Sequence, residues 1–303
     1  MNQGPQLVFS NILSSDSGQY RCVTKNELGK EYAYHPIDVK YGPKHVYINP
    51  SPSGEIEEGS SVTLSCSSDA NPAAEYTWFK NNQPLHWEPS QPHTFPSVRP
   101  EDRGTYRCQA ENKYGQLSSN SIFMDVQYAP KTPSVTVSPS GEIEEGSSVT
   151  LSCSSDANPA ANYTWFRVNR DGSSRYMNQG QQLIFRRILS SDSGRYRCDT
   201  QNKLGDKCFF ISINVKYAPK TPSVTVSPSG EIEEGSSVTL SCSSDANPAA
   251  NYTWFKEHEE MKESGPNYTI TNITSEHGGN YYCQAHNAIG LHNATFLLIQ
   301  GNF

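Results

Sequence analysis

The 303-residue sequence lacks the features of several large protein classes. It has no apolar run long enough to span a bilayer and no signal-peptide-like segment at its start. Its 24 lysines and arginines are outnumbered by 31 aspartates and glutamates and form no basic stripe, which argues against a nucleic-acid partner. We therefore expect any membrane contact to depend on a transmembrane segment outside this sequence.

Signatures of catalysis and cofactor binding are missing as well. No Gly-x-Ser-x-Gly, phosphate-binding loop, His-Glu-x-x-His or protein-kinase motif occurs. There is no Cys-x-x-Cys, and the eight histidines are scattered. The sequence thus predicts a protein that is not an enzyme, with no catalytic residue, no cofactor and no metal site.

What the sequence does contain favours strands over helices. It is rich in Ser, Thr, Val, Tyr and Pro and has little of the periodicity that helices need. Val62, Leu64 and Cys66 alternate with Thr63 and Ser65, which is the period of two that a half-buried strand requires. The fold is therefore predicted to be all-β.

Cysteine spacing and N-glycosylation motifs indicate an oxidising compartment. Six of the eight cysteines recur once per repeat at separations of 42, 45 and 41 residues, a pattern unusual in the reducing cytosol. Five N-x-T motifs indicate the same compartment, whereas proline excludes Asn49 and Asn71 as acceptors. The predicted glycosylation sites are Asn162, Asn251, Asn267, Asn272 and Asn293. We expect an extracellular or cell-surface protein, with glycans shielding its carboxyl-terminal end.

The chain is built from repeats. Residues 128–166 recur letter for letter at 217–255, and residues 51–74 recur at 138–161. The segment beginning at Met1 resembles the one beginning at Met177, so the chain starts in the second half of a repeat. The predicted domains are a truncated one, containing only the last strands, at 1–41 and complete ones at 44–128, 132–217 and 221–299. Because Met1 matches an internal methionine, we expect an incomplete gene model.

Other residues mark the same frame in each repeat. A tryptophan follows the first cysteine of each pair by twelve residues, and a tyrosine precedes the second cysteine by two. An Asn-x-x-Gly sequence comes next, at Asn26, Asn112, Asn202 and Asn287, where glycine would allow the positive φ of a hairpin turn. Linkers such as Tyr41-Gly-Pro-Lys contain proline, which limits flexibility and predicts a semi-rigid rod.

The Cys…Trp…Tyr-x-Cys framework resembles the immunoglobulin superfamily over nearly the whole chain. The resemblance implies tandem Greek-key β-sandwiches of the intermediate or constant-like set. It also implies that a disulfide links the two sheets, that the tryptophan packs on it, and that the tyrosine hydroxyl holds a corner. In the last repeat, His277 and Gly278 replace the corner aspartate and its neighbour, so the family's corner salt link is in doubt there. The implied disulfides are Cys66 with Cys108, Cys153 with Cys198, and Cys242 with Cys283.

Five further residues invite a functional interpretation. Cys22 is predicted to be orphaned by the truncation, and Cys208 to be a solvent-facing thiol that either links two chains or is incidental. Arg107 and Arg197, like Arg21, lie between the corner tyrosine and the cysteine. They could bind a ligand carboxylate, but a cross-strand charge pair is the favoured interpretation.

The repeated segment Ser51–Ala74, followed by Tyr-Thr-Trp-Phe, is similar to the repeats of the sialic-acid-binding immunoglobulin-like lectins. This resemblance implies a stalk fragment of an inhibitory B-cell receptor of that family. Its partners would be cell-surface glycoproteins or other immunoglobulin-superfamily proteins, with sialylated glycans bound only through an amino-terminal domain absent here. The alternatives are a structural array of the neuronal adhesion or muscle type and the ectodomain of a receptor enzyme.

Overall fold

The computed structural model describes residues 4–89 and 92–300, nearly all of them in strands and the loops between strands. None of the helices in these two ranges is long and apolar enough to cross a membrane. The chain divides into two compact units, one of residues up to 129 together with 157–159, the other of 130–156 with the residues from 160 onward. The first three residues of the predicted partial domain 1–41 lie outside the described ranges.

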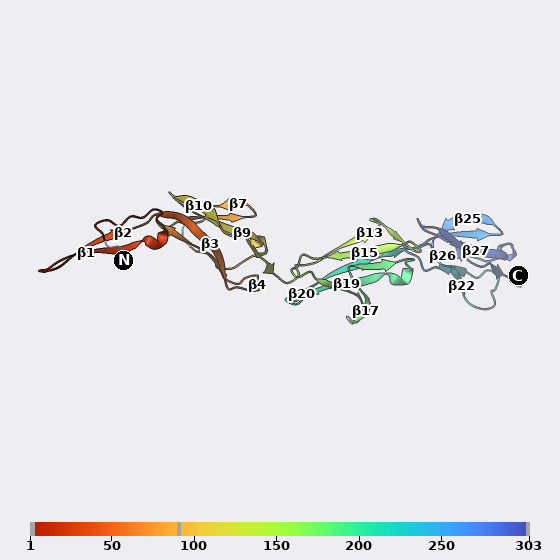
Figure 1. The fold of residues 1–303 in the computed structure, drawn as a ribbon. Helices are drawn as coiled ribbons and strands as arrows, with labels where there is room; N and C mark the ends of the chain where they lie inside the picture. Colours follow the sequence, from red (N-terminus) through yellow and green to blue (C-terminus); the bar gives the residue numbers. More distant parts are fainter. Residues whose placement is uncertain (1–3, 90–91, 301–303) are drawn as a thin grey trace. The chain divides into compact units, whose positions relative to one another are not determined.

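The first unit begins with a β-hairpin. Strand β1 (Gly18–Asn26) pairs antiparallel with β2 (Gly29–Ile37) along its whole length, and both are drawn in red in Figure 1. Tyr20 is the half-buried residue of β1 and lies edge-on to Phe9, with ring centroids 5.4 Å apart. Almost every other side chain of the hairpin is exposed, so it contributes little core of its own.

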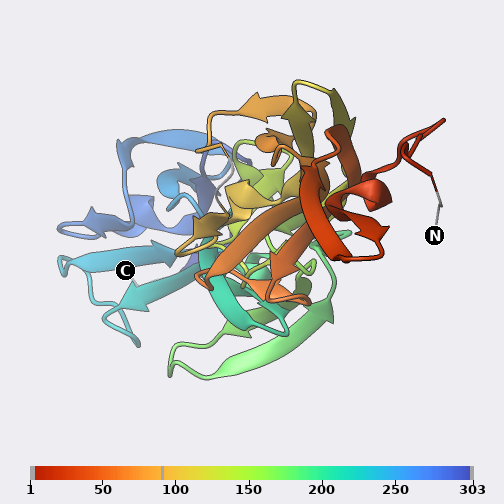
Figure 2. The ribbon, with the colours of Figure 1, turned by 60° about the vertical axis from the view of Figure 1, so that its left-hand side comes forward.

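The rest of the first unit is a β-sandwich, brought forward in Figure 2. One sheet has the order β3-β5-β8 and the other β10-β9-β6-β7, with β11 also on β9. A short parallel pair joins β12 to β4. The strands are β3 (Tyr41–Ser51), β4 (Ile56–Glu57), β5 (Val62–Asn71), β6 (Glu75–Lys80), β7 (Gln83–Leu85), β8 (His93–Phe95), β9 (Gly104–Asn112), β10 (Gly115–Ser118), β11 (Ile122–Met124) and β12 (Val126–Gln127).

The second unit contains a second sandwich with the same plan. Its sheets are β13-β15-β18 and β17-β16-β19-β20, and β14 pairs in parallel with β21. The strands are β13 (Ser134–Ser138), β14 (Ile143–Glu144), β15 (Val149–Ser154), β16 (Asn162–Val168), β17 (Ser174–Gln179), β18 (Gln182–Phe185), β19 (Gly194–Asn202), β20 (Gly205–Ile213) and β21 (Val215–Lys216).

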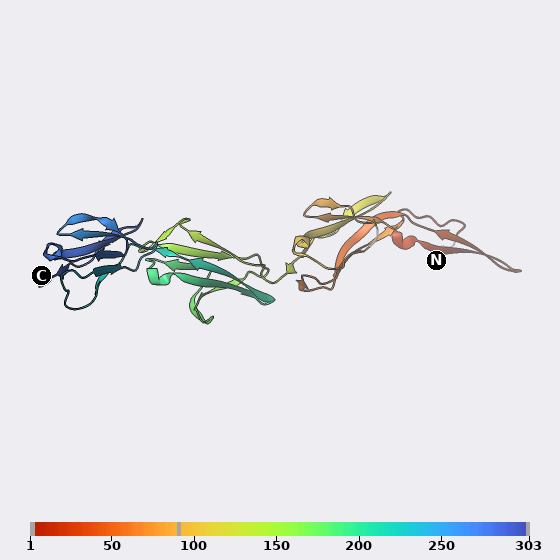
Figure 3. The same cartoon turned by 180° about the vertical axis from the view of Figure 1, so that it is seen from behind.

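A third sandwich completes the second unit, and Figure 3 shows it from behind. Its sheets are β22-β23-β26 and β25-β24-β27-β28, with β29 also on β27. The strands are β22 (Ser223–Ser227), β23 (Val238–Ser243), β24 (Asn251–Lys256), β25 (Glu259–Ser264), β26 (Asn267–Ile270), β27 (Gly279–His286), β28 (Leu291–Asn293) and β29 (Leu297–Ile299).

Each sandwich has its own apolar core, formed by the inward-facing residues of both sheets. In β5, Val62 and Leu64 are fully buried, while Thr63 between them is only half-buried, as the period of two predicts. The three tryptophans Trp78, Trp165 and Trp254 are the largest buried side chains. These alternating patterns confirm the predicted all-β fold of tandem sandwiches.

A tyrosine corner precedes the second cysteine of every repeat. The hydroxyl of Tyr106 donates to the carbonyl oxygen of Asp102 at 2.7 Å, and Tyr196 and Tyr281 make the same bond in their sandwiches. Burial raises the pKa of the Tyr281 hydroxyl to about 12, so it stays a donor at physiological pH. The predicted corner role of these tyrosines is therefore confirmed.

The corner aspartate caps a short 3-10 turn, and His277 takes its place in the last sandwich. In the second sandwich a carboxylate oxygen of Asp192 accepts from the backbone N–H of Leu189 at 2.8 Å. In the last sandwich His277 Nδ1 accepts from the backbone N–H of Thr274 at 3.0 Å. His277 thus takes over the backbone hydrogen bond that the corner aspartate accepts in the other two complete sandwiches.

Candidate functional site

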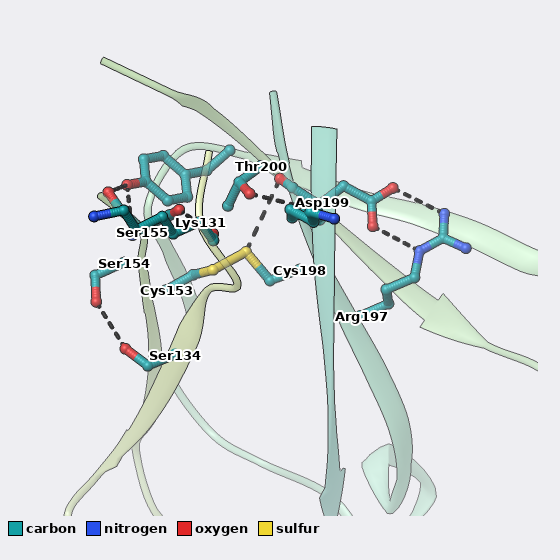
Figure 4. The surroundings of a disulfide bond; sticks show 11 residues. Lys131, Ser134, Cys153, Ser154, Ser155, Arg197, Cys198, Asp199 and Thr200 are labelled. Carbon is teal, nitrogen blue, oxygen red and sulfur yellow. Dashed lines mark hydrogen bonds and ion pairs between the residues drawn. A yellow bond between two sulfur atoms is a disulfide. The ribbon is translucent and has the colours of Figure 1, made fainter. Parts of the chain in front are cut away.

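The six cysteines of the three predicted pairs face one another between the two sheets of their sandwiches. The Cα atoms are 6.4 Å apart for Cys66 and Cys108, and 6.6 and 6.5 Å apart in the other two pairs. Figure 4 shows the bonded sulfurs of Cys153 and Cys198. The fully buried Trp165 pairs in register with Cys198, so the disulfide and the tryptophan occupy the same layer of the core.

The two unpaired cysteines lie on exposed strands. Cys22 is in β1, opposite Ala33 of β2. Cys208 is in β20, opposite Asp199 of β19, and its side chain is exposed as its position in the strand predicts. Each lies in a different compact unit, and neither has another cysteine as its cross-strand neighbour.

All five predicted glycan acceptors are exposed. Asn162 and Asn251 begin the equivalent strands β16 and β24 of the two sandwiches in the second unit. Asn267 begins β26, Asn272 lies in the turn that follows with a φ of +58°, and Asn293 ends β28. Their accessibility makes each a usable acceptor in a secreted protein.

The three arginines next to the second cysteine pack on aromatic rings. The guanidinium carbon of Arg107 is 3.9 Å from the centroid of the Phe79 ring, and that of Arg197 is 4.7 Å from the centroid of Phe166. In each case the aromatic residue is the direct cross-strand partner. Arg21 is 5.4 Å from the Tyr32 ring.

The favoured cross-strand charge pair is wrong for Arg197, the one arginine of the three with an acidic partner in the structure. Its Nε lies 2.8 Å from Oδ1 of Asp199, two residues further along the same strand (Figure 4). Residues two apart share one face of a strand, so the two side chains meet without a second strand. The cross-strand position is already filled by Phe166.

The junctions between successive repeats form the site that sequence reasoning missed. In the first unit the side-chain nitrogen of Asn71 donates to the carbonyl oxygen of Val39 at 3.0 Å and to the side chain of Asp38. In the second unit Asn247 makes the equivalent bonds to Val215 and Asn214, at 2.8 and 2.7 Å. Asn158, which belongs to the first unit, repeats the contact with Val126 at 2.7 Å. Each asparagine thus holds the final strand of the preceding repeat.

A second asparagine clamps the same linker from the other side. The side-chain nitrogen of Asn287 donates to the carbonyl oxygens of Tyr217 and Pro248, both at 2.9 Å. Its side-chain oxygen accepts from the backbone N–H groups of Ile289 and Gly290, at 2.9 and 3.1 Å. Asn112 makes equivalent bonds to Tyr41 and Pro72 in the first unit. One amide therefore shapes the hairpin turn and fixes the linker.

The glycine of Asn-x-x-Gly does not adopt the predicted positive φ at Gly115 or Gly290, so that prediction is wrong for these two residues, and at Gly290 the glycine allows close packing. A Cβ added at Gly290 would lie 3.0 Å from the Cβ of Ala218 in the linker. The turn is closed by the asparagine oxygen, and the glycine is needed because the linker passes directly over it.

A charged cluster flanks the junction of the second unit. The Lys220 ammonium lies 2.6 Å from a carboxylate oxygen of Asp245, and the Tyr217 hydroxyl donates to the other oxygen at 2.7 Å. The bond from Lys220 and then that from Tyr217 hold the pKa of Asp245 below its usual range. Its bond to Asp245 and partial burial raise the pKa of Tyr217. Because the cluster is exposed, its contribution to stability is small, and the half-buried amide bonds of Asn247 and Asn287 contribute more to the joint.

The signal for these junctions was present in the sequence. The Asp-Ala-Asn-Pro-Ala-Ala segment recurs in all three complete repeats. The proline after Asn71 excludes this asparagine as a glycan acceptor. A polar residue that recurs with a repeat but fits no surface function is a candidate for the contact between repeats.

Comparisons with known proteins agree with this architecture. Models of the immunoglobulin domain match residues 46–126, 132–202 and 221–300. The B-cell receptor CD22 of Mus musculus is 33% identical over 95% of this chain, which covers 33% of that protein. Hemicentin-1 and the basement membrane-specific heparan sulfate proteoglycan core protein, both of Mus musculus, are 27% identical over 96% and 99% of the chain. The chain spans a third or less of the length of these relatives.

Among solved structures, the full ectodomain (Ig1–Ig3) of mouse nectin-like molecule 4 is similar, with a TM-score of 0.51 and 21% identity. The alignment covers 82% of this chain and 97% of that one. At this identity the similarity concerns the fold. The matched models cover more than half of the chain, and each matched range contains most of one of its three buried cores. This chain is an array of extracellular-type immunoglobulin domains and belongs to the immunoglobulin superfamily.

Proposed function

We propose that the chain is a stalk segment of an inhibitory B-cell receptor that resembles the sialic-acid-binding immunoglobulin-like lectins. The observation that carries this proposal is the 33% identity to the B-cell receptor CD22 over 95% of the chain. The domains would run from 44 to 128, 132 to 217 and 221 to 299, after a partial domain at 1–41. The role is non-enzymatic: the array holds a recognition domain at a set distance from the membrane.

The junctions support a spacer role in physical terms. At each junction, asparagines make several hydrogen bonds between a linker and the sandwich that follows it, as Asn247 and Asn287 do around Tyr217. A linker with its backbone groups bonded on both sides has fewer conformations than a free one. Within each compact unit, such a joint restrains the linker more than a flexible tether would. Recognition of sialylated glycoproteins would belong to a domain beyond this chain.

The proposal is tested on the protein that cells make. An antibody raised against the second sandwich is used to stain B cells and to precipitate its antigen before and after antigen-receptor cross-linking. We expect a glycosylated membrane protein, longer than this chain, that gains phosphotyrosine after cross-linking. An antigen that is absent from B cells, or one that shows no phosphotyrosine response, would overturn the inhibitory-receptor proposal.

A matrix or adhesion array is the second candidate. The similarity to hemicentin-1 and to the basement membrane proteoglycan core protein extends over nearly the whole chain, although at 27% identity. Fractionation with the same antibody separates the two. Antigen that is recovered from deposited matrix, and not from detergent-solubilised plasma membrane, would favour the matrix role.

A further inference from the structure

The last sandwich carries an aromatic patch on the outward face of its β24-β27-β28 sheet. We define it by Phe255, Tyr282, Phe296 and His258. The rings of Phe255 and Tyr282 stack in parallel, with centroids 4.9 Å apart and planes 7° apart. Phe296 lies edge-on to Tyr282, with centroids 5.0 Å apart, and is 54% exposed. His258 lies 5.4 Å from Phe296. Apolar rings gathered on a solvent-facing sheet are a candidate surface for a further contact.

The last sandwich differs from the other two complete sandwiches at the position of Tyr282. At the position of Tyr282 the other two complete sandwiches have Arg107 and Arg197, each packed over the phenylalanine of the neighbouring strand. Those guanidinium groups cover the ring with a charged, hydrated surface. In the last sandwich tyrosine takes that place, and the face remains aromatic.

A glycan acceptor borders the patch on the same face. Asn293 pairs in register with Gln284, which lies two residues from Tyr282 along β27. Two residues along a strand are about 7 Å, the length of a single sugar unit or a little more. The side-chain nitrogen of Gln284 donates to the side-chain oxygen of Asn293 at 2.9 Å. This bond orients the Asn293 amide through its oxygen and leaves the nitrogen, the atom that receives the sugar, for modification.

We propose that the N-glycan on Asn293 is the cover of this patch, with its first N-acetylglucosamine packed on the rings of Tyr282 and Phe296. The C–H face of a pyranose ring is apolar, and it fits the electron-rich face of an aromatic ring. A sugar chain anchored at the border of the patch needs no separate partner to reach it. The attached carbohydrate thus becomes part of the packed surface of the sandwich.

The test uses the full chain secreted from mammalian cells, with occupancy at Asn293 measured by glycopeptide mass spectrometry. Asn293→Gln removes the acceptor, and Tyr282→Arg removes the aromatic platform with a residue that two sandwiches of this chain already carry. We expect Asn293→Gln to lower the melting temperature of the last sandwich by about 2–6 °C. The same change in the Tyr282→Arg background should have less than a third of that effect. The acetamido methyl protons at Asn293 should show an upfield ring-current shift that Tyr282→Arg abolishes.

Two matched controls localise the effect. Asn251 is an acceptor on the same sheet, but it lies four residues, or about 13 Å, from Phe255, so the effect of Asn251→Gln should not depend on Tyr282. Leu291 is an exposed apolar residue on the other side of Asn293; Leu291→Ala should leave the glycan's effect unchanged. An unmodified Asn293, or an effect that follows Leu291 and not Tyr282, would overturn the proposal. The stalk role proposed above would remain, because it does not require a sugar at this residue.

Discussion

Asn287 offers the sharpest test of how the repeats are joined. Its amide makes four hydrogen bonds, two within the hairpin through the oxygen and two to Tyr217 and Pro248 through the nitrogen. Asn287→Ala removes all four. Asn287→Asp keeps the oxygen that accepts in the turn but removes the donor and sets a negative charge against two carbonyl oxygens. The pair of variants therefore separates the turn from the linker.

The magnitude follows from the bonds lost. A net hydrogen bond contributes about 0.5–1.5 kcal/mol, and groups that regain water on opening fall at the lower end of that range. Because Asn287 is only half-buried, we expect Asn287→Ala to cost about 2–3 kcal/mol of local stability. At about 1.4 kcal/mol for each factor of ten, this corresponds to exchange faster by about 30–140-fold.

Hydrogen exchange of the full chain, followed by mass spectrometry, measures the amide exchange rates of the hairpin and of the linker separately. Asn287→Ala should accelerate exchange in the hairpin at Ile289 and in the linker at Tyr217, whose N–H donates to the carbonyl of Asn247. Asn287→Asp should accelerate the linker and leave the hairpin protected. Leu291→Ala, an exposed change in the same hairpin, should alter neither. Equal exchange rates of the hairpin in both Asn287 variants, or an unchanged rate in the linker, would refute the claim that the Asn287 oxygen holds the turn and its nitrogen the linker.

Three further outcomes are expected. Burial lowers the pKa of His93 below its usual 6.5, so the unfolded chain binds the proton more tightly, and the first complete sandwich should lose stability as the pH falls below 6.5. His93→Leu, the residue found at the equivalent Leu183, should flatten this dependence in denaturant titrations at pH 7 and pH 5. His277→Asp should stabilise the last sandwich by about 0.5–1 kcal/mol, since aspartate makes a charge-assisted bond in the other corners. A lower free energy of unfolding in denaturant titrations of this variant would contradict the expectation. Peptide mapping of the secreted protein should find the three intrasandwich disulfides, and free thiols at those positions would refute the extracellular assignment.

The fold could be read from the sequence because its determinants are local and repeated. The alternation around Val62 and Leu64 sets which face of the strand is buried, and the tryptophan and tyrosine occur at fixed distances from the cysteines. Each of these signals lies within a few residues of the element it specifies. The corner tyrosines and the exposure of Cys208 were predictable for the same reason.

The recurring asparagines mark where a junction lies, but which residues meet at a junction or across a sheet face was not predictable, because these contacts join residues far apart in the chain. Asn287 meets Tyr217 across 70 residues, and no local pattern announces that contact. Arg197 was expected to find an acidic partner across the strand pair, but an aromatic ring occupies that position. Which polar residue meets which linker is decided by the packing of two sandwiches, and sequence periodicity carries no record of it.

The two halves of each joint are supplied by different repeats, so the gene can gain or lose a repeat without breaking a joint. The strand whose backbone carbonyl accepts the bond, such as that of Val126 or Val215, ends one repeat, and the asparagine that donates to it lies in the sequence of the next. Residues 128–166 and 217–255 are identical. Unequal recombination between them would therefore remove or add 89 residues and leave an intact joint each time. The number of repeats can therefore change between alleles or species without any compensating mutation at a joint.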